Sequence, residues 1–325
     1  MASIPKVSIV IPVYNVEEYI KQCLDSIVNQ TLQDIEIIVV NDCSPANEDK
    51  IIQEFAHKDS RIKYIKLEKN VGQGEARNIG LSQATGEYFY CADSDDYLDL
   101  TLLEKAYNKA KSLDADMLFF QLTIVDCKTG EITPHKIITP TMLALENKAF
   151  SYQDTDGFFF DFWGAPHTKI YKKEFYKQNI NYPNLVEYED AVVSFNGWLK
   201  AKRIAFINEC LYYYRINRSG SITYGAPARV CEIKMYISCL INIFNKENLL
   251  EKYKYQLMGY LVNMMHWRAP NKEVFIFIRD IVKHYISKNE LQSTLLPPKS
   301  IKRLRGVLTY PFWYYKFKFF HRHRH

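Results

Sequence analysis

The 325-residue sequence lacks the cysteine patterns of two classes of protein. It has seven cysteines, an odd number, with no Cys-x-x-Cys pair and no spacing typical of a zinc ligand set. They are scattered along the chain: Cys23, Cys43, Cys91, Cys127, Cys210, Cys231 and Cys239. A disulfide scaffold and a structural zinc site are therefore not expected, and the pattern favours a reducing compartment.

Long apolar segments are also missing. No run of 18 apolar residues occurs, so we expect no segment that spans a bilayer. The apolar run at residues 7–13 is long enough to imitate the core of a signal peptide. A single lysine precedes it, however, and no small-residue cleavage site follows before Glu17. We interpret this run as a buried strand.

Two glycine-rich phosphate-binding motifs are absent as well. No Gly-x-Gly-x-x-Gly follows the first apolar run, and no Gly-x-x-x-x-Gly-Lys-Ser/Thr occurs anywhere. The usual backbone cradles for dinucleotides and nucleoside triphosphates are therefore excluded. A nucleotide bound by this chain would need another group, such as a metal ion, to neutralise its phosphates.

The composition is that of an ordinary globular protein, with 47% hydrophobic and 24% charged residues, enough for one large domain or two smaller ones. Strand-like and helical patterns alternate over the first 120 residues. Strand patterns occupy residues 6–14, 35–41, 61–67, 87–92 and 115–120, and helical patterns occupy residues 16–30, 47–58, 73–84 and 100–113. This alternation predicts an α/β fold whose parallel sheet is covered by helices on both faces.

Short, mostly polar stretches follow four consecutive predicted strands. They contain Pro12, Tyr14 and Asn15; Asn41, Asp42 and Ser44; Lys69, Asn70 and Gly72; and Asp93, Ser94, Asp95 and Asp96. Ligands of such sheets bind beyond the carboxyl ends of the strands, so we expect these residues to share one edge. The three carboxylates of the last group raise the cost of ionising one another, and a bound Mg²⁺ or Mn²⁺ ion would offset that repulsion.

Four segments in a fixed order stand out from the rest of the chain. They read VSIVIPVYNVEEYIKQCLDSI, IEIIVVNDCSP, NVGQGEARNIGLSQATGEYFYCADSDDYLD and YEDAVVSFNGW. Together they resemble the signature of family 2 glycosyltransferases, inverting enzymes with the GT-A fold, closely over residues 6–115 and more loosely over residues 160–222. The resemblance implies a Rossmann-like, mostly parallel central sheet. It also implies transfer of a sugar from a nucleotide diphosphate sugar, usually a UDP-sugar, to an acceptor hydroxyl, assisted by Mg²⁺ or Mn²⁺.

By that resemblance, the first half of the chain holds the donor. The nucleotide-sugar-binding residues that it implies are Pro12, Tyr14, Glu17, Asp42, Asn70, Arg77, Asp93 and Ser94. Asp42 would contact the nucleobase, whose slot Pro12, Tyr14 and Glu17 would line. Asp93 and Asp95 would form the Asp-x-Asp motif, with Asp95 closest to the metal ion and Asp93 nearer the ribose.

Some of these residues have a plainer interpretation from the local sequence alone. Asp95 and Asp96 are placed to cap a helix that begins near Asp99. Asp42 is placed as an ordinary turn residue. Arg77 can either pair with a helix carboxylate or approach the nucleotide, and the sequence leaves both alternatives open.

An inverting displacement needs a carboxylate that takes the proton of the acceptor hydroxyl. Glu189 and Asp190 begin a helical pattern, where the helix dipole favours ionised carboxylates. The resemblance matches them to a Glu-Asp pair of the family and implies that Asp190 is the base. The alternative is a capping pair with no part in catalysis.

Two looser matches supply further candidates on the acceptor side. FWGAPHTKIYKKEF contains Trp163, as a stacking platform for a sugar or a core residue, and Lys169, as a partner for the diphosphate. YYYRINRSGSIT contains Arg215 and Arg218, either of which is placed to offset leaving-group charge. His167 lies in no zinc-like cluster and near no matched catalytic position, so we assign it no role.

We expect the chain to have three parts. Residues 1–115 would be the nucleotide-sugar-binding half of a GT-A domain, residues 116–225 its acceptor-binding half, and residues 226–325 a helical extension. Amphipathic helical patterns at residues 227–246 and 249–266 predict that extension.

The tail, residues 299–325, holds eight basic and eight aromatic residues and no acidic ones. This mixture favours peripheral contact with an anionic membrane over nucleic acid, and a solvated tail is the alternative. We therefore predict a cytoplasmic enzyme at the cytoplasmic face of the inner membrane. It would join a nucleotide-sugar donor to a glycan or glycolipid acceptor in bacterial surface polysaccharide or lipid-linked oligosaccharide synthesis. Two other classes stay open, a metal-dependent nucleotidyltransferase and a catalytically silent nucleotide-sugar-binding module.

Overall fold

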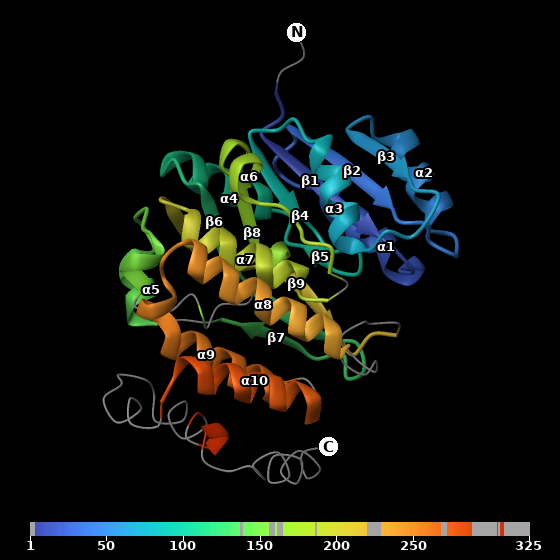
Figure 1. Ribbon diagram of the computed structural model, residues 1–325. Helices are drawn as coiled ribbons and strands as arrows, with labels where there is room; N and C mark the ends of the chain where they lie inside the picture. Colours follow the sequence, from blue (N-terminus) through green and yellow to red (C-terminus); the bar gives the residue numbers. More distant parts are fainter. Residues whose placement is uncertain are drawn as a thin grey trace. The chain divides into compact units, whose positions relative to one another are not determined.

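The computed structural model describes residues 4–136, 139–155, 160, 165–185, 187–219, 229–267, 272–287, 304 and 306–308. The chain divides into two units, Met1–Gly225 and Ala226–His325 (Figure 1). Strands and helices alternate in the first unit, and the described part of the second is helical. Among the described residues, no helix has both the length and the apolar character that crossing a membrane requires.

Within the described part of the first unit, nine strands form one sheet. They are β1 (Val7–Val13), β2 (Ile35–Asn41), β3 (Ile62–Lys66), β4 (Tyr88–Cys91), β5 (Tyr97–Leu98), β6 (Met117–Asp126), β7 (Ile132–His135), β8 (Lys169–Lys172) and β9 (Ile204–Ile216). Their order is β3-β2-β1-β4-β8-β6-β9-β5, with β7 paired to β6. The longest ladders, β6 with β9 and β1 with β2, are parallel, whereas β8 runs antiparallel to both of its neighbours. The predicted α/β fold with a mostly parallel central sheet is confirmed.

Helices follow most of the strands. Those of the first unit are α1 (Glu17–Val28), α2 (Glu48–Lys58), α3 (Gln73–Ser82), α4 (Leu102–Ser112), α5 (Pro140–Leu145), α6 (Lys173–Asn179) and α7 (Glu189–Lys200). Those of the second are α8 (Val230–Lys246), α9 (Leu250–Trp267) and α10 (Lys272–Tyr285). The first four helices and the two amphipathic helices of the extension begin within three residues of their predicted starts.

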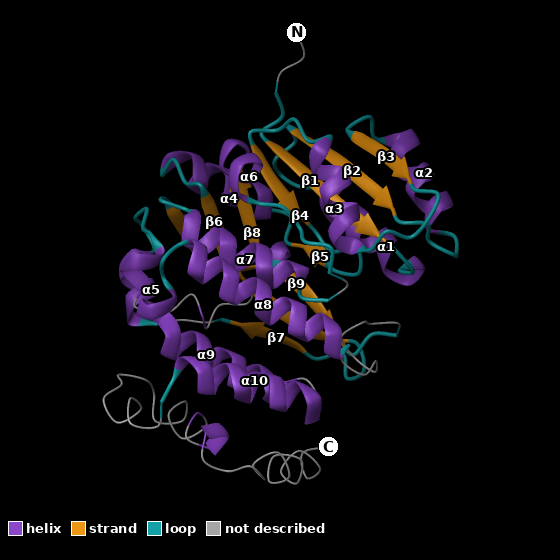
Figure 2. Ribbon diagram, in the orientation of Figure 1, coloured by secondary structure: helices purple, strands orange, loops and turns teal. Residues whose placement is uncertain are grey.

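Helices cover both faces of the N-terminal part of the sheet, as the alternation predicts. Ile9 and Ile11 of β1 share one buried cluster with Leu24 of α1 and residues of α4. Val10 points to the opposite face because side chains alternate along a strand. There Gly80 lets α3 approach, since a Cβ at Gly80 would lie 2.4 Å from Val10 Cγ1. Figure 2 shows α3, α6 and α7 on this nearer face.

The carboxyl ends of the first strands meet at one edge. In the parallel ladders, Val13 of β1 lies opposite Asn41 of β2, and Asn41 lies opposite Lys66 of β3. On the other side of β1, Val10 lies opposite Cys91, the last residue of β4. The polar stretches after these strands therefore begin at the same edge, as predicted.

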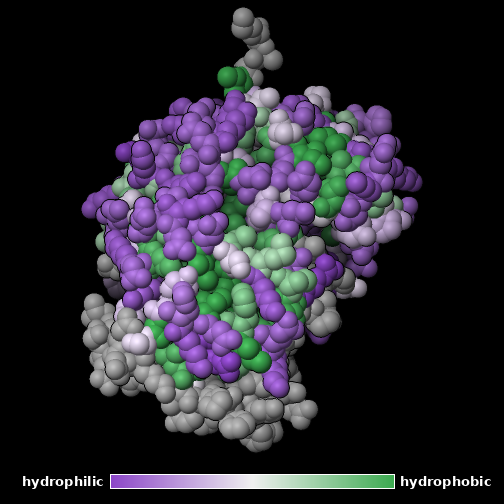
Figure 3. Space-filling view, in the orientation of Figure 1, coloured by the Kyte–Doolittle hydropathy of each residue, from purple (hydrophilic) through white to green (hydrophobic). Residues whose placement is uncertain are grey.

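The second unit buries the apolar faces of its amphipathic helices. Ile237 and Leu240 of α8 are fully buried, and so are Leu257 and Leu261 of α9. In the space-filling view of Figure 3, hydrophobic residues are interspersed with hydrophilic ones over this unit. Of the predicted membrane-binding tail, only residues 304 and 306–308 are described, and the rest lies outside the described residues.

Candidate active site

The acidic cluster Asp93–Asp96 joins β4 to the short strand β5. Helix α4 begins only after Thr101, whose main-chain N–H donates to Asp99 Oδ1 at 2.9 Å. Asp95 and Asp96 are thus separated from that helix by β5, and the alternative that they cap it is wrong. Their position must be explained by something other than helix capping.

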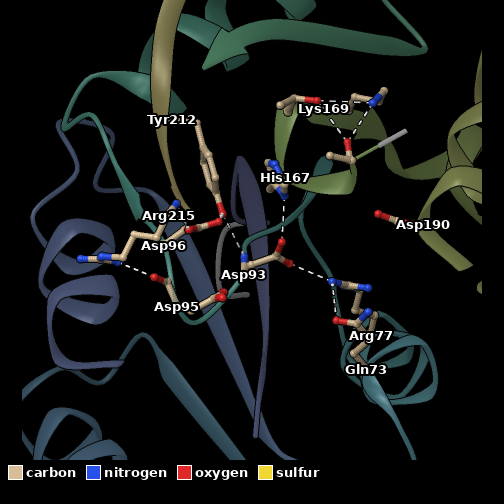
Figure 4. A network of polar contacts seen from close by, with 12 residues as sticks. Gln73, Arg77, Asp93, Asp95, Asp96, His167, Lys169, Asp190, Tyr212 and Arg215 are labelled. Carbon is tan, nitrogen blue, oxygen red and sulfur yellow. Dashed lines mark hydrogen bonds and ion pairs between the residues drawn. The ribbon is translucent and has the colours of Figure 1, made fainter. Parts of the chain in front are cut away.

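Asp93 lies at the centre of a polar network (Figure 4). Its Oδ1 accepts a hydrogen bond from Arg77 Nη2 at 2.8 Å, and its Oδ2 lies 2.8 Å from His167 Nδ1. Burial acts to raise the pKa of Asp93, but Arg77 and His167 outweigh it and hold the pKa well below its usual range. Asp93 is therefore ionised at neutral pH, while its side chain keeps 21% of its surface exposed.

Asp96, one of the three carboxylates of the predicted cluster, and His167, to which the sequence assigned no role, lie next to Asp93. Asp96 is fully buried and accepts hydrogen bonds from Tyr212 Oη and from the main-chain N–H of Arg215, each at 2.7 Å. Burial raises the pKa of Asp96 well above its ordinary value. His167 stacks on Tyr212 with ring centroids 4.4 Å apart. Ligand atoms of Asp93, Asp96 and His167 lie within 4.8 Å of one another, which is a spacing that suits a metal ion.

Asp95, predicted to be closest to the metal ion, turns to the other side of the cluster. Its carboxylate is paired with Arg218 Nε, and its main-chain oxygen accepts a hydrogen bond from the guanidinium of Arg215. That guanidinium lies 4.7 Å from the ring centroid of Tyr97 and 5.2 Å from that of Tyr19. Arg215, predicted on the acceptor side, therefore adjoins the acidic cluster together with Arg218.

Glu189 and Asp190 begin α7, as the sequence predicts, directly after Tyr188 with a left-handed φ of 69°. Glu189 is fully buried, and its Oε1 accepts a hydrogen bond from Arg77 Nη1 at 2.8 Å. Of the two alternatives for Arg77, the structure bears out the pairing with a helix carboxylate. Asp190 is half-buried, and in Figure 4 its carboxylate points toward the network of Asp93 and Arg77. Burial raises the pKa of both acids.

The remaining predicted donor residues lie at the strand ends. Both Asp42 oxygens accept main-chain hydrogen bonds, from Val71 at 2.7 Å and from Gly72 at 2.9 Å. These contacts span about 30 positions, so Asp42 does more than form a local turn. Asn70 Nδ2 reaches the main-chain oxygen of Asp42 at 3.4 Å. Of the other predicted donor residues, Pro12 and Ser94 are buried, and Tyr14 and Glu17 are exposed.

On the acceptor side, Lys169 is fully buried. Its Nζ donates to the main-chain oxygen of Ala165 at 2.8 Å and to Thr168 Oγ1 at 3.3 Å, and burial lowers its pKa to about 7. Contact of this amine with a diphosphate stays a prediction. Trp163 lies outside the described residues.

Comparison with known proteins shows which family contains this fold and this cluster of acidic residues. The family model described as glycosyl transferase family 2 matches residues 8–179, more than half of the chain. The chain belongs to glycosyl transferase family 2. It is therefore a glycosyltransferase, and the nucleotidyltransferase and the silent binding module find no support.

Two bacterial relatives of this family 2 glycosyltransferase are named enzymes. It is 31% identical over 230 residues to glycosyltransferase GlyG of Streptococcus pneumoniae. The match covers 66% of this chain and 72% of GlyG. It is 29% identical over 266 residues to the poly(ribitol-phosphate) beta-N-acetylglucosaminyltransferase TarS of Staphylococcus aureus. That match covers 79% of this chain and 44% of the length of TarS.

Solved structures agree on the fold. Residues 1–349 of S. aureus TarS, in complex with UDP-GlcNAc, match with a TM-score of 0.58 at 22% identity over 93% of this chain and 90% of that fragment. The mannosyltransferase PcManGT of Pyrobaculum calidifontis, in complex with GDP-Man and Mn²⁺, matches with a TM-score of 0.53 at 14% identity. That match covers 98% of this chain and 88% of PcManGT. The family 2 chain therefore has the GT-A fold.

The residues present fit a divalent cation, which GT-A glycosyltransferases commonly use. Asp93, Asp95 and Asp96 offer carboxylate oxygens, the ligands that Mg²⁺ and Mn²⁺ prefer. Asp93 and Asp95 are each about one-fifth exposed, so an ion can reach them from solvent. Asp96 is buried behind them and already accepts two hydrogen bonds.

Proposed function

We propose that this chain is an inverting glycosyltransferase that moves a sugar from a UDP-sugar to an acceptor hydroxyl, with Asp190 as the base. The observation that carries the proposal is the single network in which Arg77 joins Asp93 of the donor half to Glu189, the neighbour of Asp190. One side chain thus binds both a carboxylate of the donor half and the residue that precedes the expected base. The TarS fragment with UDP-GlcNAc bound supports the choice of a UDP-sugar.

Asp190 has the surroundings that a general base needs. It lies in the first turn of α7, where the helix dipole favours the ionised form. Burial opposes this and raises its pKa, whereas the charge of Arg77 lowers it. A carboxylate with a raised pKa is a stronger proton acceptor than an ordinary one. Glu189 is the less suitable base because it is fully buried and bonded to Arg77.

The metal ion, Mn²⁺ or Mg²⁺, would be held by Asp93 and Asp95 and would neutralise the diphosphate of the donor. Arg218 and Arg215 lie beside Asp95 and are placed to stabilise the charge of the leaving group. Tyr14 follows β1 and Asp42 follows β2, so both lie at the edge of the sheet where the strands end. The nucleobase would bind there, and Tyr14 is exposed. His167 holds Asp93 from the opposite side to Arg77.

We further propose a glycan or glycolipid acceptor of the bacterial surface, since TarS is named for a poly(ribitol-phosphate) acceptor. A cytoplasmic location at the inner membrane belongs to this proposal. Leu304, Val307 and Leu308, near the start of the basic tail, are buried in the protein. The proposed membrane contact is therefore tested on the residues that follow them. A chain that ends at residue 308 should bind anionic vesicles less than the full chain in a sedimentation assay. Equal binding would rule out residues 309–325 as the anchor.

The activity test uses purified full-length protein and a panel of nucleotide sugars, with release of UDP or GDP as the readout. We expect UDP release from one UDP-sugar, loss of that release in EDTA, and recovery with Mn²⁺ or Mg²⁺. Asp95→Asn should stay folded by circular dichroism and lose the release. Release of GDP alone would overturn the assigned donor class, and full activity in EDTA would overturn the metal site.

A further inference from the structure

One face of α3 is engaged by the segment that leads into α7. Asn78 Nδ2 donates to the main-chain oxygen of Tyr182 at 3.0 Å, and the main-chain N–H of Tyr182 donates back to Asn78 Oδ1 at 3.1 Å. This pair of hydrogen bonds joins residues 104 positions apart. The side-chain amide of Asn78 is thus occupied by the acceptor half.

Arg77, the preceding residue of α3, meets the same segment. Its two terminal nitrogens donate to Glu189 and to Asp93, and its guanidinium lies 5.2 Å from the ring centroid of Tyr182. Only 2% of the Arg77 side chain is exposed. So little exposed surface leaves the guanidinium turned toward the two carboxyl groups rather than toward solvent.

Gly74 lies one turn earlier on the same face of α3. A Cβ at this position would be 3.0 Å from Glu189 Cγ and 3.4 Å from the main-chain oxygen of Pro183. The missing side chain therefore lets α3 approach the start of α7 closely. The motif GEARN, whose arginine the resemblance assigned to the nucleotide, contacts the acceptor half at three positions.

We propose that Gly74, Arg77 and Asn78 form a docking face that orients the start of α7, so that Arg77 is a positioning residue for Asp190. Glu189 is the anchor on α7, and Asp190 follows it in the same helical turn. Side chains of successive helix residues diverge by about 100°, so fixing Glu189 sets the direction of Asp190. The hydrogen bond from Arg77 Nη1 holds the buried carboxyl group of Glu189 whether or not that group is ionised, which makes Arg77 necessary for this orientation.

This inference rests on the proposed role of Asp190, and its first test measures kinetics. In Gly74→Ala, the added methyl group should crowd the side chain of Glu189 and displace it, and no charged group is removed. We expect kcat to fall by about 100-fold, the usual consequence of a misplaced catalytic group, with UDP affinity in calorimetry unchanged. Arg77→Lys should lower kcat as well, but it also loosens Asp93, so unchanged UDP affinity is expected only for Gly74→Ala. As a matched control, Arg61→Lys alters another arginine–carboxylate pair of the same unit and should leave kcat unchanged.

A double-mutant cycle sharpens the test. Arg77→Gln removes the guanidinium that donates to Glu189, and Glu189→Gln replaces the carboxyl group that accepts from it. If the two residues act as one unit, the double variant should lose no more kcat than Arg77→Gln alone. Weakened UDP binding with normal kcat in the Gly74 and Arg77 variants would make Arg77 a nucleotide ligand and overturn the inference.

A second readout does not depend on any activity. Amide hydrogen exchange at residues 187–193 should become faster in Gly74→Ala and Arg77→Gln, while exchange in β1 and β2 stays as in the wild type. Unchanged exchange at residues 187–193 would refute the docking face. If the wild type transfers no sugar from any donor while exchange is still faster in the two variants, the docking face stands and the proposed function is refuted.

Discussion

Glu36 of β2 and Glu189 of α7 are both buried glutamates of the first unit, and they differ in the number of groups that reach the carboxylate. Glu36 Oε1 accepts hydrogen bonds from Ser8 Oγ at 2.5 Å and from the main-chain N–H of Gly86 at 3.0 Å. Its Oε2 is paired with Lys63 Nζ at 2.7 Å. Burial acts to raise the pKa of Glu36, but these contacts outweigh it and lower the pKa to about 2.

Glu189 has a single cation, Arg77, at one oxygen, and among the described residues its Oε2 has no hydrogen-bond partner. Burial and the adjacent charge of Asp190 raise its pKa to about 8. A carboxylate with all its hydrogen bonds made ties strands together, whereas one that is crowded and incompletely bonded belongs to a site poised for a ligand. The comparison therefore separates an acid that ties strands together from one that adjoins the proposed base, inside the same unit.

The largest effect should come from the functional pair. Asp190→Asn keeps the shape of the side chain but removes the base, so kcat should fall by about 100-fold to 10,000-fold with donor affinity nearly unchanged. Steady-state kinetics and calorimetric UDP binding measure the two quantities. Glu189→Gln should lower kcat less. If kcat is lost in Glu189→Gln and stays normal in Asp190→Asn, Glu189 is the base.

The structural glutamate should give the opposite result. Glu36→Ala leaves the hydroxyl of Ser8 and the main-chain N–H of Thr85 without the carboxylate that accepts from them, so the free energy of unfolding should fall by about 3 kcal/mol. Urea denaturation measures this, and kcat per folded molecule should not change. The exposed Glu54→Ala is the control and should shift stability by less than about 0.5 kcal/mol. A kcat effect in folded Glu36→Ala would erase the distinction between the two acids.

The two glutamates should also differ in the sign of their pH dependence. Glu36 has a lowered pKa, so it stabilises the fold above pH 4.5, and that stability is lost as the pH falls toward about 2. Glu189 has a raised pKa, so stability falls as the pH rises from 4.5 to about 8. Each contributes a slope of at most about 1.4 kcal/mol per pH unit. Urea denaturation between pH 2 and pH 9 should show that Glu36→Gln flattens only the acid limb and Glu189→Gln only the neutral one. Identical curves for both variants would contradict the pKa assignments.

Much of the fold is predictable from sequence because its local signals agree. The Val and Ile runs of β1 and β2 are buried along their whole length, and the helical patterns between them have one apolar face. The position of β8 is different. It lies between β4 and β6 and runs antiparallel to both, and its four residues KIYK carry no pattern that could specify those neighbours. Strand order here depends on packing between distant segments.

The candidate site shows the same division. Asp93 and the Glu189–Asp190 pair are predicted from the order and spacing of the four matched segments, because an acidic triplet by itself says little in a chain with 37 acidic residues. His167 is a single histidine between Pro166 and Thr168, and its contact with Asp93 joins residues 74 positions apart. No local sequence pattern predicts a contact between residues so far apart in the chain. The pairing of Arg77 with a helix carboxylate was foreseen only as one of two alternatives, because the fold alone decides which carboxylate it meets.

The ion pair of Arg77 and Glu189 also has a consequence for the order of events during synthesis. The two residues are 112 positions apart. Ribosomes add about 5 to 20 residues per second, so Arg77 is made roughly 6 to 22 seconds before its partner. During that interval the guanidinium has Asp93 as a counter-charge but lacks the carboxylate of α7. The expected base enters with the segment that completes this pair, so a nascent chain gains its catalytic geometry only after the donor half has been made.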